Sequence, residues 1–158
     1  MQGDPKIIHH LQAQLRNELT ATHQYLLHSR MLQHWGLGKL ATREYEESMG
    51  EMKHVDRLMA RIFTLDGLPN LQELGKLLVG EDVPEILDCD LRLERAAQVT
   101  LKEGMAACEV ARDYVSRELL QCILVDTEAH IDFLETQIDL LGKVGLPAYL
   151  QTHMDAVS

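Results

Sequence analysis

Metal binding is the chemistry that the residue types of this chain suggest first. Glu51 and His54 form an E-x-x-H element, whose i, i+3 spacing places a carboxylate and an imidazole on one face of a helix. Both groups are ligands that divalent transition metals accept. By itself the pair is weak evidence, because a glutamate on a solvated face and an ordinary core histidine have the same spacing. A metal site can be predicted only if other helices carry further ligand residues at matching positions.

Two segments with equal internal spacing supply those donors. Glu18 precedes Glu51 by 33 residues. Glu94 precedes Thr127 by the same interval. A shift of 76 residues superimposes the two segments and takes the histidine of the first E-x-x-H element onto His130. The sequence therefore predicts two hairpins in register, related by an internal pseudo-twofold axis, with their polar residues at one depth.

Glutamates from two helices, combined with E-x-x-H elements from two others, form the di-iron carboxylate arrangement of ferritin-like bundles. Bridging carboxylates hold the two ions about 3.5–4 Å apart. The candidate ligands are Glu18, Glu51, His54, Glu94 and His130. Burying three carboxylates in one seam without cations would cost several kcal/mol each, which argues against a purely structural role. The pattern predicts an iron centre.

Long amphipathic helices must position these residues. Helical periodicity and breaks at Gly and Pro predict helices over about residues 5–34, 39–65, 83–111 and 114–142, and a short one over about 148–154. Residues 66–82 form the one long connection, which we expect to link parallel neighbours. The predicted fold is all-α: a single ferritin-like domain over 1–158, built as an antiparallel four-helix bundle with a long crossover and a short fifth helix.

Composition narrows the class of protein. Apolar residues make up 46% of the 158 residues and charged residues 25%, which is typical of a globular domain. The net charge of −10 argues against nucleic acid as a partner and favours cations. Because the chain has neither a long apolar run nor a signal-peptide pattern, we expect a cytoplasmic protein without a membrane partner. Three cysteines without a CxxC pattern predict free buried thiols.

At these residues the chain resembles the bacterioferritins, the haem-containing branch of the ferritins. The resemblance covers nearly the whole length and is specific in the segments 1–4, 67–71, 113–117 and 130–135. It implies a hollow cage of twenty-four subunits that stores a ferric mineral core. The cage would be a homo-oligomer or would include a second bacterioferritin subunit. Glu18 and His54 would hold one iron, Glu94 and His130 the other, and Glu51 would bridge them.

The resemblance also implies a second cofactor. Met52 is about 100° around its helix from Glu51 and should point away from the seam towards a neighbouring subunit. In bacterioferritins the matching methionines of two subunits ligate haem b, and the alternative is an ordinary apolar interface methionine. Tyr25, in the seam, is either packing or an electron donor near the metals. A ferredoxin-type protein is the expected external electron donor. The other histidines, including His28, are interpreted as surface or interface residues.

One position departs from the family pattern. The second bridging glutamate falls at position 127, where this chain has Thr127, so the second E-x-x-H element is broken. Three carboxylates leave one positive charge of two Fe²⁺ ions unbalanced, and we expect weaker occupancy of the second position. Glu128 has the wrong rotation to substitute. Asp126, one turn before His130, is the better candidate for rescue.

Three functions compete. The leading hypothesis is iron storage by a subunit whose ferroxidase centre is impaired by Thr127. The alternative is a competent ferroxidase, in which Asp126 or water replaces the lost bridge. A di-iron oxygenase acting on an organic substrate would need an apolar access cavity, and such enzymes are generally longer chains. The number of ions bound per subunit separates the first two hypotheses.

Overall fold

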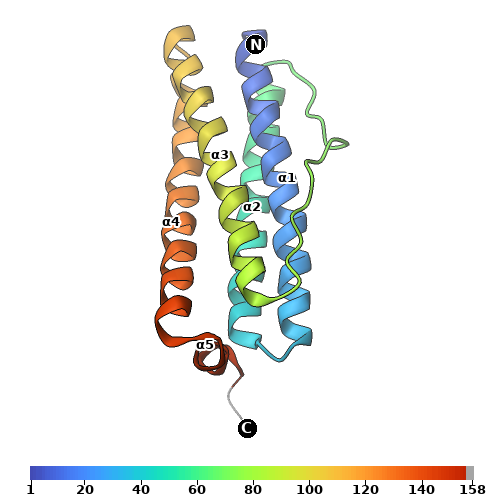
Figure 1. Ribbon diagram of the computed structural model, residues 1–158. Coiled ribbons are helices and arrows are strands. Elements are labelled where there is room, and N and C mark those ends of the chain that lie inside the picture. Colours follow the sequence, from blue (N-terminus) through green and yellow to red (C-terminus); the bar gives the residue numbers. More distant parts are fainter. Residues whose placement is uncertain (156–158) are drawn as a thin grey trace.

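Five helices account for most of the chain in the computed structural model, which describes residues 1–155 (Figure 1). They are α1 (Pro5–His34), α2 (Gly38–Thr64), α3 (Val83–Ala111), α4 (Tyr114–Val144) and α5 (Leu146–His153). The expected all-α bundle with a short fifth helix is confirmed. Every helix end lies within two residues of its expected bound.

Side-chain caps explain where three of the long helices begin. The Asp4 carboxylate accepts a hydrogen bond from the backbone N–H of Lys6 (2.8 Å), and Pro5 occupies the first turn of α1. Asp82 caps α3 in the same way and accepts from the backbone N–H of Glu85 (2.9 Å). At α4, Asp113 accepts from the backbone N–H of Ser116 (3.0 Å). Each cap pairs a donor that the first helical turn would leave unpaired.

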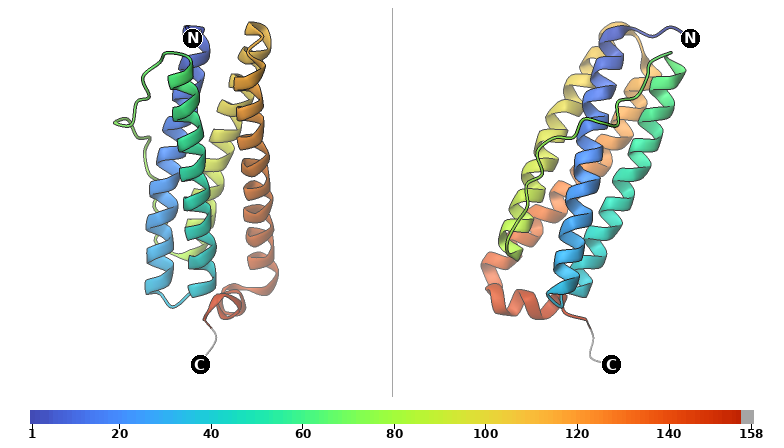
Figure 2. Two further views of the ribbon diagram at one scale, coloured as in Figure 1. Left: turned by 180° about the vertical axis from the view of Figure 1, so that it is seen from behind. Right: turned by 90° about the vertical axis from the view of Figure 1, so that its right-hand side faces the viewer.

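The four long helices form two antiparallel hairpins, α1 with α2 and α3 with α4 (Figures 1 and 2). α1 packs against both α2 and α3, and α4 packs against both α3 and α2. α2 and α3 therefore run in the same direction but lie diagonally across the bundle. The expectation that the crossover links parallel neighbours is wrong in one respect, since α2 and α3 are parallel but are not neighbours. Residues 66–82 follow the length of α1 on the outside of the bundle (Figure 2).

A stripe of polar side chains on α1 fixes this crossover. The Gln12 side chain donates to the Leu68 carbonyl (2.6 Å) and accepts from the backbone N–H of Asn70 (3.0 Å). Further along α1, the backbone N–H groups of Gly75, Leu78 and Gly80 donate to side chains, whose acceptor residues are Thr20, Gln24 and His28. Because these bonds pair the backbone polar groups of an irregular segment, the crossover lies against α1 without a helix or strand of its own.

The core consists of two apolar clusters on either side of a polar layer. One cluster lies towards the start of α1 and includes Leu11, Leu15, Leu58, Leu101 and Ile123. The other lies towards its end and includes Leu32, Leu40, Leu87, Leu134 and Tyr149. Between them the predicted seam carries the candidate ligands, all of which are buried. The bundle therefore holds these polar groups at mid-length, buried between two apolar clusters.

Other features of the sequence have mixed outcomes. The three cysteines are free, but only Cys108 is buried, while Cys122 is exposed, so the expectation of buried thiols holds for one of them alone. In the part of the chain that is described, no helix combines the length and the apolar character needed to cross a membrane.

Candidate metal centre

Helices α1 and α2 bring three potential ligands together in the polar layer. Glu18, Glu51 and His54 have donor atoms within 4.8 Å of one another. Nδ1 of His54 lies 3.2 Å from Oε2 of Glu51 and 3.5 Å from Oε2 of Glu18. The other oxygen of Glu18 accepts a hydrogen bond from the Gln14 amide (2.9 Å). One imidazole nitrogen and two carboxylate oxygens therefore surround a point that one divalent ion could occupy.

The opposite side of the His54 ring is occupied by a carboxylate from α4. Nε2 of His54 donates to Oδ2 of Asp126 at 2.8 Å. This contact orients the ring and directs Nδ1 towards Glu18 and Glu51. Metal-bound histidines are commonly held in this way by a carboxylate on the far nitrogen, which also makes the ligating nitrogen more basic. The arrangement fits a metal ligand better than an ordinary core histidine.

Helices α3 and α4 contribute the second set of donors. Nδ1 of His130 lies 2.9 Å from Oε1 of Glu94, and the same oxygen accepts a hydrogen bond from the Tyr25 hydroxyl (2.5 Å). Glu47 of α2 also reaches this set, with its Oε2 at 3.6 Å from Nδ1 of His130. The atoms of Glu47, Glu51 and His130 form a second group within 4.8 Å. Glu51 therefore belongs to both groups, as a bridging carboxylate would.

Thr127 lies where the internal repeat requires it, buried in the same layer with 3% of its surface exposed. The hydroxyl of threonine is a neutral donor and is too short to span two ions. Asp126 does not take its place in this structure, because it contacts the outward-facing nitrogen of His54 and its side chain is 65% exposed. The geometry therefore gives no support to rescue by Asp126.

Burial and mutual charge shift the protonation of the centre. Burial raises the pKa of Glu18, although the hydrogen bond and charge of His54 oppose this. For His54, burial would lower the pKa, but contacts with Glu18 and Asp126 raise it overall. His130 behaves alike, since Glu94 outweighs burial and raises its pKa. Without metal, the two imidazoles therefore keep their protons to a higher pH than a free histidine does, and cations would have to displace those protons.

Tyr25 lies at the junction between this centre and a second polar cluster. Burial and the charges of Glu94 and Asp90 raise the pKa of Tyr25 well above its usual value of 10.0, so the hydroxyl stays protonated and donates to Glu94. This contact is compatible with both roles expected for Tyr25, packing and electron donation. It ties α1 to α3 at the level of the centre.

Sequence reasoning missed that second cluster, which consists of His28, Glu44 and Asp90. All three residues are buried, and Nδ1 of His28 lies 2.8 Å from Oδ1 of Asp90. The interpretation of His28 as a surface or interface residue is wrong, because the crossover covers it and the Gly80 N–H donates to its Nε2 (3.0 Å). The available signal was the polar stripe on α1, which recurs at helical spacing through residues 20, 24 and 28.

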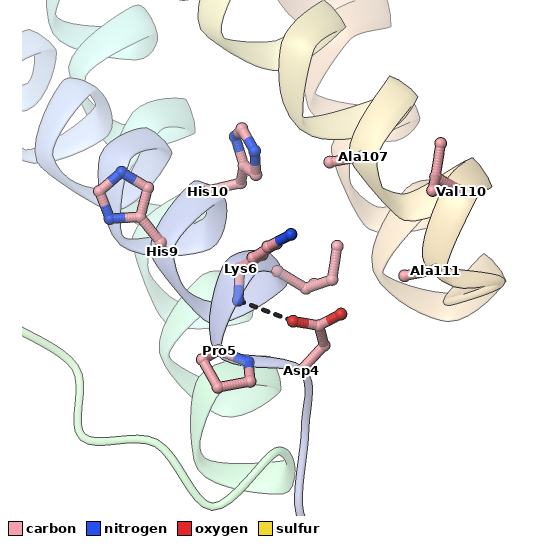
Figure 3. A pocket seen from close by; sticks show the side chains of 9 residues that line it. Asp4, Pro5, Lys6, His9, His10, Ala107, Val110 and Ala111 are labelled. Atoms are coloured by element: carbon pink, nitrogen blue, oxygen red, sulfur yellow. Dashed lines mark hydrogen bonds between the residues drawn. The ribbon is translucent and has the colours of Figure 1, made fainter.

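Features outside the polar layer are less suited to metal binding. Met52 projects from α2 with 45% of its surface exposed, as its rotation from Glu51 predicts. A surface groove of about 610 Å³ lies between the start of α1 and the end of α3 (Figure 3). His9 and His10 both line this groove, and the His10 ring lies nearer to α3 than the His9 ring does (Figure 3). The three donor groups found among residues 1–155 lie elsewhere.

The bundle and its buried carboxylate–histidine layer define the class of protein. The chain matches the family of ferritin-like domains over residues 8–144. It is 47% identical to a bacterioferritin of Brucella melitensis biotype 1 over 96% of this chain and 94% of the relative. It is 45% identical to a bacterioferritin of Mycobacterium leprae over 94% of each chain. For a bacterioferritin of Rhodobacter capsulatus the identity is 46% over 92% of this chain and 90% of the relative.

This protein therefore carries a ferritin-like domain. Within that class, the nearly full-length similarity shows that the chain belongs to the bacterioferritin family.

Proposed function

We propose that this protein stores and detoxifies iron as a subunit of a hollow, haem-containing cage of twenty-four subunits. The observation that carries the proposal is the convergence of Glu18, Glu51, His54, Glu94 and His130 in one buried layer of a bacterioferritin-family bundle. Buried carboxylates at this density need cations to balance them. Fe²⁺ is the cargo that the family name suggests for that role.

Each ligand has a distinct task in this proposal. Glu18 and His54 hold the first iron, Glu94 and His130 hold the second, and Glu51 lies between the two groups and bridges them. A pair of Fe²⁺ ions held in this way supplies electrons to dioxygen or peroxide, and the ferric product adds to the mineral core. Asp126 orients His54. Tyr25 orients Glu94 through its hydroxyl. We propose that it also donates an electron to the iron centre.

Thr127 makes the two iron positions of this centre differ in their ligands. The first position has two carboxylates, an imidazole and the orienting contact of Asp126. At the second position, the bridge expected at 127 is replaced by a neutral hydroxyl, and the charge of the second ion is less well balanced. We propose that the second iron binds more weakly than the first and that the first oxidation phase is slowed. A second subunit type with an intact glutamate would complement this defect in a mixed cage.

A competent ferroxidase is the second candidate function, and one observation favours it. Glu47 approaches His130 from α2 and offers a carboxylate near the position that Thr127 leaves without one. The two candidates differ in the occupancy of the second position. They share the fold, the cargo and the ligands of the first position.

Haem b is the other proposed cofactor. Met52 lies on the outer face of α2 and is 45% exposed, so its thioether is free to ligate haem iron together with Met52 of a second subunit. A haem in that place would pass electrons from a ferredoxin-type donor towards the stored mineral. We also propose that the cage acts in the cytoplasm.

Anaerobic titration of the purified homopolymer with Fe²⁺ tests the proposed function. We expect one tightly bound ion per subunit, a second ion with lower affinity, and a mineral core after air is admitted. Size-exclusion chromatography with light scattering should give the mass of twenty-four subunits. A protein that binds no Fe²⁺ before oxidation, or that forms no mineral afterwards, would contradict the proposal.

A further inference from the structure

The second iron position has a carboxylate neighbour that the internal repeat does not predict. Glu47 places Oε2 at 3.6 Å from Nδ1 of His130, the nitrogen that also faces Glu94 at 2.9 Å. Its oxygen, an oxygen of Glu51 and a nitrogen of His130 all lie within 4.8 Å of one another. A shift of 76 residues takes Glu47 to Ile123, so the first position has no equivalent group.

We propose that Glu47 supplies the carboxylate that Thr127 does not, so that the second iron binds among Glu47, Glu51, Glu94 and His130. This inference rests on the proposed iron-binding function and favours its second candidate, a competent ferroxidase, since it assigns a further carboxylate ligand to the second position of the same centre. Glu47 lies beside His130, in the half of the bundle where the repeat has Thr127 in place of a glutamate.

The position of Glu47 on α2 suits this role. It lies four residues before Glu51, so both side chains project from one face of the helix. The side chain of Glu47 is 22% exposed, which leaves it room to move while Glu51 and His130 are buried. A ligand at the edge of a buried site can approach an ion without a change in the helices.

Arg43 holds the metal-free conformation of Glu47. The Arg43 Nε donates to Oε1 of Glu47 at 3.0 Å, and its guanidinium lies 3.8 Å from the centre of the Phe133 ring. One carboxylate oxygen is therefore anchored outside the centre, and the other is directed at His130. The positive charge of Arg43 also stabilises Glu47 until a cation binds.

Charge balance supports the same conclusion. Glu18, Glu51 and Glu94 offset three of the four positive charges of two Fe²⁺ ions. Glu47 provides the fourth negative charge, which matters most where water is excluded and the effective dielectric constant is low. Asp126 is another acidic residue close to the centre, but it faces the opposite nitrogen of His54 and cannot reach the second position from there.

Anaerobic calorimetric titration with Co²⁺ tests this inference without any oxidation step. The variants are Glu47→Gln, which keeps the size of the side chain, and Glu46→Gln as a matched control on the exposed side of α2. We expect two ions per subunit in the parent. Glu47→Gln should keep the affinity of the first ion and weaken the second about tenfold or more, in the range typical of lost metal-site groups. Glu46→Gln should match the parent.

A double variant makes the test specific. If Glu47 replaces the missing bridge, Thr127→Glu should restore binding of the second ion in the Glu47→Gln background. Equal second-ion affinities in the parent and Glu47→Gln would overturn the inference, as would a parent that binds one ion only. Loss of both ions from the parent would contradict the proposed function itself. Circular dichroism and the mass of the assembly establish that each variant is folded.

Discussion

Asp126 and His54 are joined across two helices by a 2.8 Å contact between Oδ2 and Nε2, on the side of the ring that faces away from Glu18 and Glu51. The residue that the sequence offers as a substitute bridge therefore contacts the His54 ring from its other side and fixes the orientation of that ring. In the internal repeat, the position on α2 that corresponds to Asp126 is Gly50, which has no side chain. His130 therefore has no carboxylate partner equivalent to the one that Asp126 gives His54. The two histidines are held in unequal surroundings.

Removing the Asp126 carboxylate should weaken the first metal position. In Asp126→Ala, the His54 ring loses the contact that fixes its orientation, and we expect the affinity for the first Co²⁺ to fall by about 10–100-fold. Glu128→Ala is the matched control, since Glu128 is exposed on the same helix and bonds to Gln98. Anaerobic calorimetry measures both. An unchanged first affinity in Asp126→Ala would show that Asp126 does not orient His54.

Introducing a glutamate at position 127 should reverse the order of thermal stability when metal is added. In metal-free Thr127→Glu a further carboxylate is buried, so the melting temperature should be unchanged or lower, by about 2–4 °C for each kcal/mol lost. With Co²⁺ bound, the added ligand should raise it above that of the parent. Thr127→Gln, which adds bulk without charge, should show no such reversal. Scanning calorimetry with and without Co²⁺ measures these melting temperatures. If Co²⁺ raised the melting temperature of Thr127→Glu and of Thr127→Gln equally, the bridging role would be contradicted.

Replacing Met52 with leucine should remove haem and leave the fold intact. Leucine keeps much of the volume of methionine but has no sulfur lone pair, and Met52 is half-exposed on α2, so stability should change little. We expect nearly complete loss of the haem absorption per subunit in Met52→Leu. Met49→Leu, a change of the same type on the same helix, should retain it. Full haem content in Met52→Leu would rule out the axial role.

The metal-free protein should become less stable as the pH rises. Folding raises the pKa values of His54 and His130 above 6.5. Their stabilising contribution is complete below pH 6.5 and is lost as the pH passes through the raised folded pKa values. Folding also raises the pKa values of Glu18 and Glu44 above 4.5. Their contribution to the free energy of unfolding is therefore also lost as the pH rises, starting from a lower pH than for the histidines. Urea unfolding with a chelator at several pH values between about 5 and 9 should show this decline.

Bound metal should oppose that trend, because metal competes with protons for the same ligands and binds more tightly at higher pH. A metal-free profile that rises or stays flat over the same range would contradict the assigned direction of the pKa shifts.

Glu44 should contribute to this pH dependence separately from the metal centre. Burial and the negative charge of Asp90 raise the pKa of Glu44 well above its usual value of 4.5, so its carboxyl is protonated in the folded state. Among residues 1–155, Oε2 of Glu44 and Oδ2 of Asp90 are buried without a hydrogen-bond partner. Glu44→Gln keeps a neutral group of the same size and should reduce the decline of stability with pH. A profile identical to the parent's would show that Glu44 does not titrate there.

Local signals in the sequence are sufficient to predict the helices, their order and the depth of the polar layer. Helical periodicity, proline in the first turns and aspartate caps are local signals, and they gave the observed helix bounds because each residue acts on its own or the next turn. The equal 33-residue spacing in the two hairpins placed the donors at one level without knowledge of how the hairpins pack. Periodicity and repeat arithmetic therefore identified Glu18, Glu51, His54, Glu94 and His130 as one buried set.

Packing between the helices determines which side of each histidine ring contacts which carboxylate. The sequence does not distinguish the roles of Asp126 and Glu47, since both are acidic residues one helical turn before a candidate ligand. Packing directs Asp126 to the outer nitrogen of His54 and Glu47 towards His130. His28 likewise became a buried residue because the crossover returns along α1 and covers it. These outcomes depend on rotation and distance between helices that are far apart in the chain, which local periodicity does not encode.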